Sequence, residues 1–436
     1  MKKIFWVVVL MLLLCCFSSA VADSAKQYTG GDYVYILLED GTAEIVDYEG
    51  SASSLTVPAK LDNHSVTGIG DYAFAGTKLQ RIELPDTIVK VGANPFRSCN
   101  MLDAIRVSPD HPALATIDGV LFDKNQKKLI SYPVTFSAAE YQVPKGICVI
   151  GESAFDHAMV QTVVLQEGIT TIEKQAFAWC KSLRNVELPE GLTTIGEQAF
   201  SYCEALSNIA LPQGLVSMDE EVFVSCYSLA AITLPDSLTE AKGNPFKLCI
   251  SLTGIGVSAD NSRYYVQDEV LFDRIEQKLV SYPCGKTDGE YKVPDGVNVI
   301  GDAAFYGCDF LKNLVLPDGL VSIEYEGIAS CKSLVSIDLP DTVTDIAEYA
   351  FASCSALKDV VISEGITKLN RSVFSMCKAL KNVTLPSGIN DINSMTFFMC
   401  PDNLSFTVAR DSWAAQWCQE QGYDYQYHDS LDWLNE

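Results

Sequence analysis

The stretch IEKQAFAWCKSLRNVELPEGLTT, from Ile172 to Thr194, decides the fold, because the same pattern starts again at Ile195. Its unit is I-x-x-x-A-F-x-x-C-x-x-L-x-x-I-x-L-P-x-G-L-x-x, 23 residues long, and twelve copies can be aligned. The copies begin at Ile69, Val91, Ile150, Ile172, Ile195, Met218, Ala241, Ile300, Ile323, Ile346, Leu369 and Ile392. Eleven of the twelve carry Phe at the sixth position, and the exception is Ile328. A repeat of this period predicts a solenoid in which each copy forms one coil.

Each column of the repeat has a physical role. Val186 and Leu188 alternate with polar residues, which is the pattern of a half-buried strand. Pro189 lacks a backbone donor and ends the strand, and Gly191 is free to adopt the positive φ of a turn. One unit cannot enclose its own apolar side chains, whereas stacking buries each large one for about 1.5–3 kcal/mol. We therefore expect a mostly β, right-handed solenoid of about twelve coils of 23 residues.

A larger duplication lies over the short repeat. The segment Asn94-Pro-Phe recurs as Asn244-Pro-Phe, and Val120-Leu-Phe-Asp recurs as Val270-Leu-Phe-Asp, each 150 residues later. Both blocks interrupt the coils with an insert, residues 108–149 and 258–299. The apolar runs in these inserts are bounded by turn residues, which predicts β-hairpin strands.

The first residues resemble an export signal. Lys2 and Lys3 precede fourteen apolar residues, and Ala20-Val21-Ala22 fits a cleavage site, so residues 1–22 are expected to be a signal peptide. Fourteen apolar residues are too few to span a membrane. Cys15 and Cys16 leave lipidation of the leader as an alternative.

Both ends of the repeat array depart from the pattern, as terminal units of a solenoid must. Residues 23–66 contain Tyr33-Val-Tyr-Ile-Leu, Asp40-Gly41 and a second apolar run to Tyr48, which predicts a hairpin cap. The solenoid is expected over residues 67–408. In residues 409–436, Trp413 and Trp417 are spaced like one face of a helix, which predicts a C-terminal cap.

The units resemble the BspA-like leucine-rich repeats of bacterial and protist surface proteins, through their Ala-Phe, Cys-x-x-Leu and Leu-Pro-x-Gly-Leu signature. The resemblance covers about residues 30–425, including the inserts and the Trp-Ala-Ala-Gln-Trp closing segment. It implies a leucine-rich-repeat solenoid and a role as an adhesin that binds host matrix proteins or other cells. Unlike many members, this sequence shows no appended anchor module, so we expect secretion, with the mode of retention at the cell surface left open.

The charge of the chain excludes some partners. The formal charge is −25, and it becomes −27 without Lys2 and Lys3. Binding to nucleic acid or anionic lipid needs clustered basic residues, so neither is expected as a partner. We expect a monomer without a membrane span, whose acidic field favours basic patches on a partner.

Ten cysteines occupy one column of the repeat. They are Cys99, Cys180, Cys203, Cys226, Cys249, Cys308, Cys331, Cys354, Cys377 and Cys400. Side chains in such a ladder point the same way at a spacing of about 4.8 Å, whereas a disulfide needs facing Cβ vectors, so free, buried thiols are expected. Off the column, Cys148 and Cys284 are too many coils apart to bond to each other, and Cys418 could reach Cys400.

The residues give little support for catalysis or for a cofactor. His64, His111, His157 and His428 do not recur in register, and no nucleophile or zinc motif is present. The inserts hold matched acids, Asp110 with Asp260, Asp118 with Asp268 and Asp123 with Asp273. These carboxylates could bind calcium, but acids beside hairpin strands more often cap turns. We expect no cofactor, no metal and no enzymatic activity.

The candidate binding residues flank the central apolar residue of each predicted strand. They are Arg81, Glu83, Asn185, Glu187, Asn208, Thr233, Asn313, Asp338, Asn382 and Thr384. Repeat proteins of this kind usually bind through a concave face, where we expect these side chains to lie. The sequence therefore favours a secreted or cell-surface protein that binds an extracellular protein or glycan over an extended surface. A passive spacer is the alternative, an enzyme comes third, and the inserts remain a competing binding surface.

Overall fold

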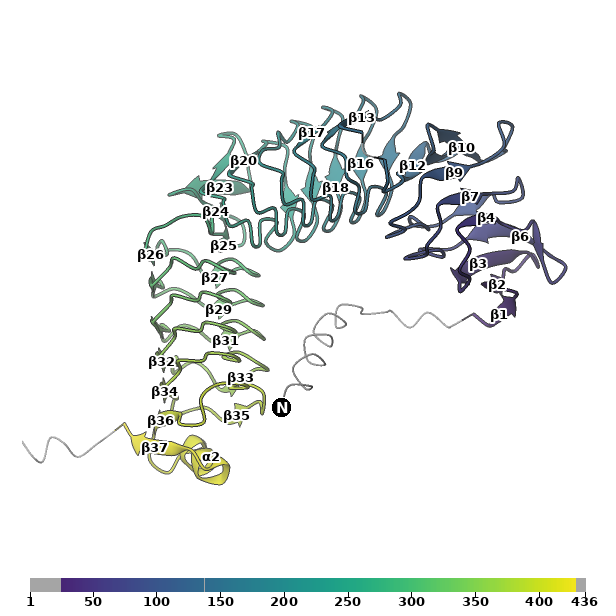
Figure 1. Ribbon diagram of the computed structural model, residues 1–436. Helices are drawn as coiled ribbons and strands as arrows, with labels where there is room; N and C mark the ends of the chain where they lie inside the picture. Colours follow the sequence, from purple (N-terminus) through teal and green to yellow (C-terminus); the bar gives the residue numbers. More distant parts are fainter. Residues whose placement is uncertain (1–24, 137, 429–436) are drawn as a thin grey trace, which may run out of the picture.

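A computed structural model describes residues 25–136 and 138–428, so the predicted signal peptide lies outside the described residues. The chain winds into stacked coils that follow an arch, with a purple-to-blue arm, a teal top and a green-to-yellow arm (Figure 1). The described part is nearly all β, and its helix is α2, Trp413–Gln421. The expected β solenoid is confirmed. No helix within these residues is long and apolar enough to cross a membrane.

The strands of the L-x-x-I-x-L columns form the long-strand ladder. It consists of β4 (Ser54–Thr56), β7 (Arg81–Glu83), β9 (Ala104–Arg106), β13 (Glu140–Gln142), β15 (Thr162–Val164), β17 (Asn185–Glu187), β20 (Ala231–Leu234), β22 (Gly254–Val257), β26 (Glu290–Lys292), β28 (Asn313–Val315), β30 (Ser336–Asp338), β32 (Asp359–Val361), β34 (Asn382–Thr384), β36 (Ser405–Val408) and β37 (Asp424–Tyr427). Neighbours pair in parallel, as Thr162 does with Asn185 one coil later. The pairing is interrupted, because residues 208–210 form no strand and β28 does not pair with β30.

The first apolar residue of each repeat and the residue before it form a second, short-strand ladder. It consists of β3 (Ala43–Tyr48), β6 (His64–Ile69), β8 (Lys90–Val91), β12 (Lys128–Ser131), β14 (Val149–Ile150), β16 (Thr171–Ile172), β18 (Thr194–Ile195), β19 (Ser217–Met218), β21 (Glu240–Ala241), β25 (Lys278–Ser281), β27 (Val299–Ile300), β29 (Ser322–Ile323), β31 (Asp345–Ile346), β33 (Lys368–Leu369) and β35 (Asp391–Ile392). Through the teal part it runs unbroken from β12 to β21, so this side of the coils is tightly paired there.

Phenylalanine rings stack through the centre of the array. The rings of Phe177 and Phe200 lie 5.1 Å apart and those of Phe200 and Phe223 5.5 Å apart, both nearly parallel. Ile328, the exception in this column, is buried in the same position. The repeat period therefore places one large ring in each layer, and each ring packs against the coils on both sides.

The cysteine column lies in the core beside these rings, as expected. Each column thiol donates to a main-chain carbonyl of the preceding coil, as Cys203 Sγ does to the carbonyl of Phe177 at 3.2 Å. Burial raises the pKa of the Cys203 thiol well above its usual range. In this structure none of the described cysteines is bonded to another, so Cys400 and Cys418 are not joined.

The inserts contain the predicted hairpins, but they are also part of the solenoid. In the first insert β10 (Leu114–Ile117), β11 (Val120–Asp123) and β12 form an antiparallel meander, and β12 then pairs in parallel with β14. The second insert repeats this with β23 (Tyr264–Gln267), β24 (Val270–Asp273) and β25. Strands β13 and β26 of the inserts also pair within the long-strand ladder, so the inserts form additional coils. The number of coils therefore exceeds the twelve copies of the repeat.

The two ends of the described array depart from the repeat. The expected hairpin is β2 (Tyr33–Leu37) with β3, extended by β1 (Gln27–Gly30), and β3 pairs in parallel with β6, which pairs with β5 (Lys60–Leu61). At the other end the Ser412 side chain accepts a hydrogen bond from the Ala415 N–H and caps helix α2. Strand β37 follows the helix and adds one more strand to the long-strand ladder, which the sequence did not predict.

Candidate functional site

The predicted binding residues lie in one row, here called the strand face. The strand face comprises the outward side chains on either side of the central apolar residue of each long strand. Arg81, Glu83, Asn185, Glu187, Asn208, Thr233, Asn313, Asp338 and Asn382 are exposed, and Thr384 is half-buried. The ladder therefore presents these side chains one coil after another.

The strand face does not lie on the inner side of the arch. Figure 1 shows β26, β32, β34 and β36 along the outer edge of the green arm, with β27, β29 and β31 nearer the inside. The expectation of a concave position is therefore wrong there.

Two hollows open on the strand face where neighbouring long strands are unpaired. One, of about 280 Å³, is lined by Asn208, Ala210, Ala231 and Thr233, among others. The other, of about 260 Å³, has Asn313 and residues of β30 at the equivalent repeat positions. An unpaired strand leaves peptide groups without ladder partners, so each hollow combines main-chain polar groups with short side chains.

Polar contacts connect the strand face along the array. Asn382 Nδ2 donates to Asp359 Oδ1 at 2.6 Å, from one coil to the previous one. Arg81 lies 3.5 Å from Asp103, but both side chains are well exposed, so the pair contributes little stability. Asp359 and Val361, which belong to the same row and are exposed, were missing from the predicted set.

A larger hollow, of about 600 Å³, lies over the short strands near the first insert. Its acidic lining residues are Asp71, Glu152, Glu173, Glu197 and Asp219, and its basic ones are Lys128 and Lys174. Lys128 pairs with Glu173 at 2.6 Å, and Lys174 pairs with Glu197 at 2.7 Å. Sequence reasoning missed this acidic hollow, because its walls come from coils on both sides of an insert.

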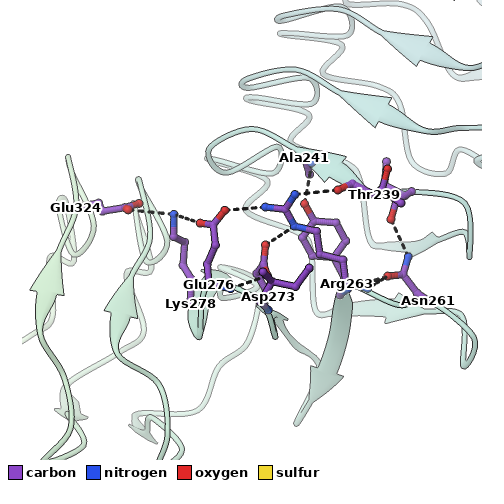
Figure 2. A network of polar contacts seen from close by, with 11 residues as sticks. Thr239, Ala241, Asn261, Arg263, Asp273, Glu276, Lys278 and Glu324 are labelled. Carbon is purple, nitrogen blue, oxygen red and sulfur yellow. Dashed lines mark hydrogen bonds and ion pairs between the residues drawn. The ribbon is translucent and has the colours of Figure 1, made fainter.

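The equivalent place beside the second insert holds a charged network (Figure 2) and a smaller hollow of about 190 Å³. Arg263 lies between Asp273, at 2.6 Å from its Nε, and Glu276, at 2.7 Å. Lys278 joins Glu276 to Glu324 at 2.6 and 3.0 Å. The first block has Ala113 where the second has Arg263, so the two junctions differ in charge although their backbones match.

One matched pair of acids, Asp123 and Asp273, and the histidine His111 hold turns in the inserts. Asp123 Oδ1 accepts hydrogen bonds from the N–H groups of Asn125 and Gln126, and Asp273 does the same one block later. His111 is buried, and its Nδ1 accepts from the Leu114 N–H at 3.0 Å. These side chains accept hydrogen bonds from the main chain of their own turns, which favours the turn-capping interpretation over calcium binding.

Beside the network, Asp302 lines a hollow of about 190 Å³ together with Lys247. Burial raises the pKa of Asp302 to about 6; Lys247 opposes the rise, and Glu326, Glu220 and Glu324 add to it. Below about pH 6 the carboxyl group of Asp302 is therefore mostly neutral in the folded protein. The associated stabilisation is present near pH 4 and is lost as the pH rises through about 6.

Replacing Asp302 with asparagine tests whether the raised pKa of Asp302 makes the stability of the protein depend on pH. The variant stays neutral, so at about pH 8 it should be more stable than the parent by about 1 kcal/mol after solvent screening, and near pH 4 the two should be equal. Urea unfolding at both pH values measures the difference. An identical difference at the two pH values would contradict the assignment.

Comparison with known proteins gives one family. The model of the BspA type leucine rich repeat region matches in six copies, over residues 48–143, 148–270 and 282–403. A leucine rich cell surface protein of Faecalibacterium prausnitzii is 26% identical, with a TM-score of 0.52 over 95% of this chain and 97% of that one. No protein with a curated description matches.

Two further solved structures share the fold. A leucine-rich repeat protein of Eubacterium ventriosum is 24% identical, with a TM-score of 0.59 over 68% of this chain and 82% of that one. The pneumococcal vaccine antigen PcpA is 19% identical, with a TM-score of 0.53 over 93% of this chain and 99% of that one.

Proposed function

Because the chain belongs to the BspA-type leucine-rich repeat family, we propose that it is a secreted or cell-surface protein that binds an extracellular protein or glycan through its strand face. The similar protein of Faecalibacterium prausnitzii is described as a cell surface protein, which supports this location. The proposed activity is binding without catalysis.

The observation that carries the proposal is the repetition of exposed, mostly polar side chains along the strand face. Asn185 and Glu187 of β17 are followed one coil later by Asn208 and two coils later by Thr233, all exposed. Such a row offers many modest contacts, and binding energy can be summed over several coils without a deep pocket. The two hollows add unpaired peptide groups, which suit the hydrogen bonds of a glycan or an extended peptide.

The charge of the protein indicates which partners it favours. A formal charge of −25 creates a field that attracts basic surfaces and repels anionic ones. Association with a basic protein should therefore slow as salt is added, whereas binding to a neutral glycan should depend little on salt.

The test begins with a screen of residues 23–436 against immobilised extracellular matrix proteins and a glycan array. For any partner found, the variant Asn185→Ala, Glu187→Ala, Asn208→Ala and Thr233→Ala should weaken binding at least about tenfold, because it removes contacts over three successive coils. Single substitutions should weaken it by less than about threefold. Surface plasmon resonance measures the affinities.

The matched control changes exposed residues on the other side of the coils. Thr170, Thr193, Val216 and Thr239 precede four successive short strands and are exposed. Their replacement by alanine should leave the affinity unchanged. Loss of binding in this control, or only after shortening of the hairpin loops in the inserts, would place the binding surface elsewhere and overturn the proposal.

A further inference from the structure

The two 150-residue blocks differ at one pair of positions in a way that points to covalent chemistry. Val134 follows Ser-Tyr-Pro in the first insert, and Cys284 follows the same tripeptide in the second. One coil later, Ala158 of the first block corresponds to Cys308 of the second. Both positions therefore hold small apolar residues in one block and cysteines in the other.

The structure brings this pair of cysteines together. Cys284 Sγ and Cys308 Sγ are 2.8 Å apart, closer than the van der Waals contact of two sulfur atoms. Cys284 comes from the segment after β25, outside the repeat column, so its side chain meets Cys308 from a different direction. The parallel orientation that separates neighbouring thiols within the column does not apply to this pair.

Cys308 also departs from the other column cysteines in its hydrogen bond. The thiols of Cys99, Cys180, Cys203, Cys226, Cys249, Cys331, Cys354, Cys377 and Cys400 donate to a carbonyl of the preceding coil at 2.9–3.2 Å. For Cys308 the corresponding distance, to the Tyr282 carbonyl, is 3.9 Å. Its sulfur lies farther from the carbonyl and next to Cys284.

We propose that Cys284 and Cys308 form a disulfide that ties the second insert to the coil that follows it. The oxidant is a low-molecular-weight disulfide. One thiolate attacks it and releases a small thiol, and the second thiolate then displaces the other small thiol from the mixed disulfide. The two cysteines lose two protons and two electrons, and the small disulfide takes up both to become two small thiols.

The bond forms most readily while the chain is folding. In the folded protein both sulfur atoms are buried, and burial raises the pKa of Cys308 well above its usual range. A buried thiol with a raised pKa is a poor nucleophile for exchange. The same burial protects the finished disulfide from reductants.

The experiment refolds residues 23–436 from denaturant in a mixture of oxidised and reduced glutathione, then alkylates free thiols in denaturant without reductant. Of the thirteen cysteines in this segment, eleven should be alkylated. Peptide mapping by mass spectrometry should join the peptides of Cys284 and Cys308. The oxidised protein should also melt about 2–6 °C higher than the reduced protein.

The first block supplies the matched control. The double variant Cys284→Val and Cys308→Ala restores the Val134 and Ala158 pair, so it should fold, show eleven free thiols under both conditions and melt at one temperature. Thirteen alkylated cysteines in correctly refolded protein would overturn the proposal. Linkage of Cys308 to Cys331 or to another column cysteine would overturn it as well.

Discussion

Replacing Phe200 with alanine is expected to lower the free energy of unfolding by about 3–5 kcal/mol, because the cavity cannot collapse between two rigid layers. The Phe200 side chain is fully buried, and its ring stacks on those of Phe177 and Phe223 in the adjacent coils. The void is therefore shared by three layers. Urea unfolding followed by circular dichroism measures the loss, and hydrogen exchange should show faster opening in the two neighbouring coils.

Phe310→Ala is the matched control for this substitution. The Phe310 side chain is 52% exposed, so its removal should change the free energy of unfolding by less than about 0.5 kcal/mol. Similar losses in the two variants would mean that the phenylalanine column does not support the stacked layers.

Replacing Lys247 with methionine is expected to destabilise the protein by about 3 kcal/mol, because two partly buried acids, Glu221 and Glu326, lose their partner. Lys247 Nζ lies 3.0 Å from Glu221 and 2.6 Å from Glu326, and its side chain is 15% exposed. It also lies over the ring of Tyr306. Methionine keeps the apolar stem but leaves two carboxylates with like charge close to Asp302, and urea unfolding at neutral pH measures the cost.

Two further variants separate charge from packing. Lys247→Arg keeps the cation, and arginine is the residue that the first block has at this position, as Arg97, so most of the stability should return. Lys332→Met breaks an exposed ion pair with Asp309 and should cost less than about 1 kcal/mol. If Lys247→Arg were as unstable as Lys247→Met, the charge of Lys247 would not be the cause.

The sequence predicted the fold well because one repeat unit determines it. Leu188, Pro189 and Gly191 mark a strand, its end and a turn, and most copies of the repeat keep at least part of this pattern in register. The core position of the cysteine column and of Phe200 followed from the same periodicity. Local patterns were therefore sufficient wherever a residue contacts its own coil or an identical neighbour.

Features that depend on how the coils stack could not be predicted in the same way. The outer position of the strand face depends on the curvature of the whole array, which no single unit encodes. The acidic hollow near Lys128 and the network around Arg263 join residues on both sides of an insert. The contact between Cys284 and Cys308 could not be predicted because Cys284 lies in an insert, outside the register of the repeat.

Because the two inserts are equivalent, the length of the protein can change by one complete 150-residue block. Asn94 and Asn244 begin matching junctions, and their side-chain amides donate to the carbonyls of Ser153 and Ala303 at 2.8 Å in both. A gene that lost residues 94–243 would join Ala93 to Asn244 in an unbroken register. Recombination between the blocks can therefore produce shorter or longer relatives without a new junction, so the length of this protein can evolve separately from its coil architecture.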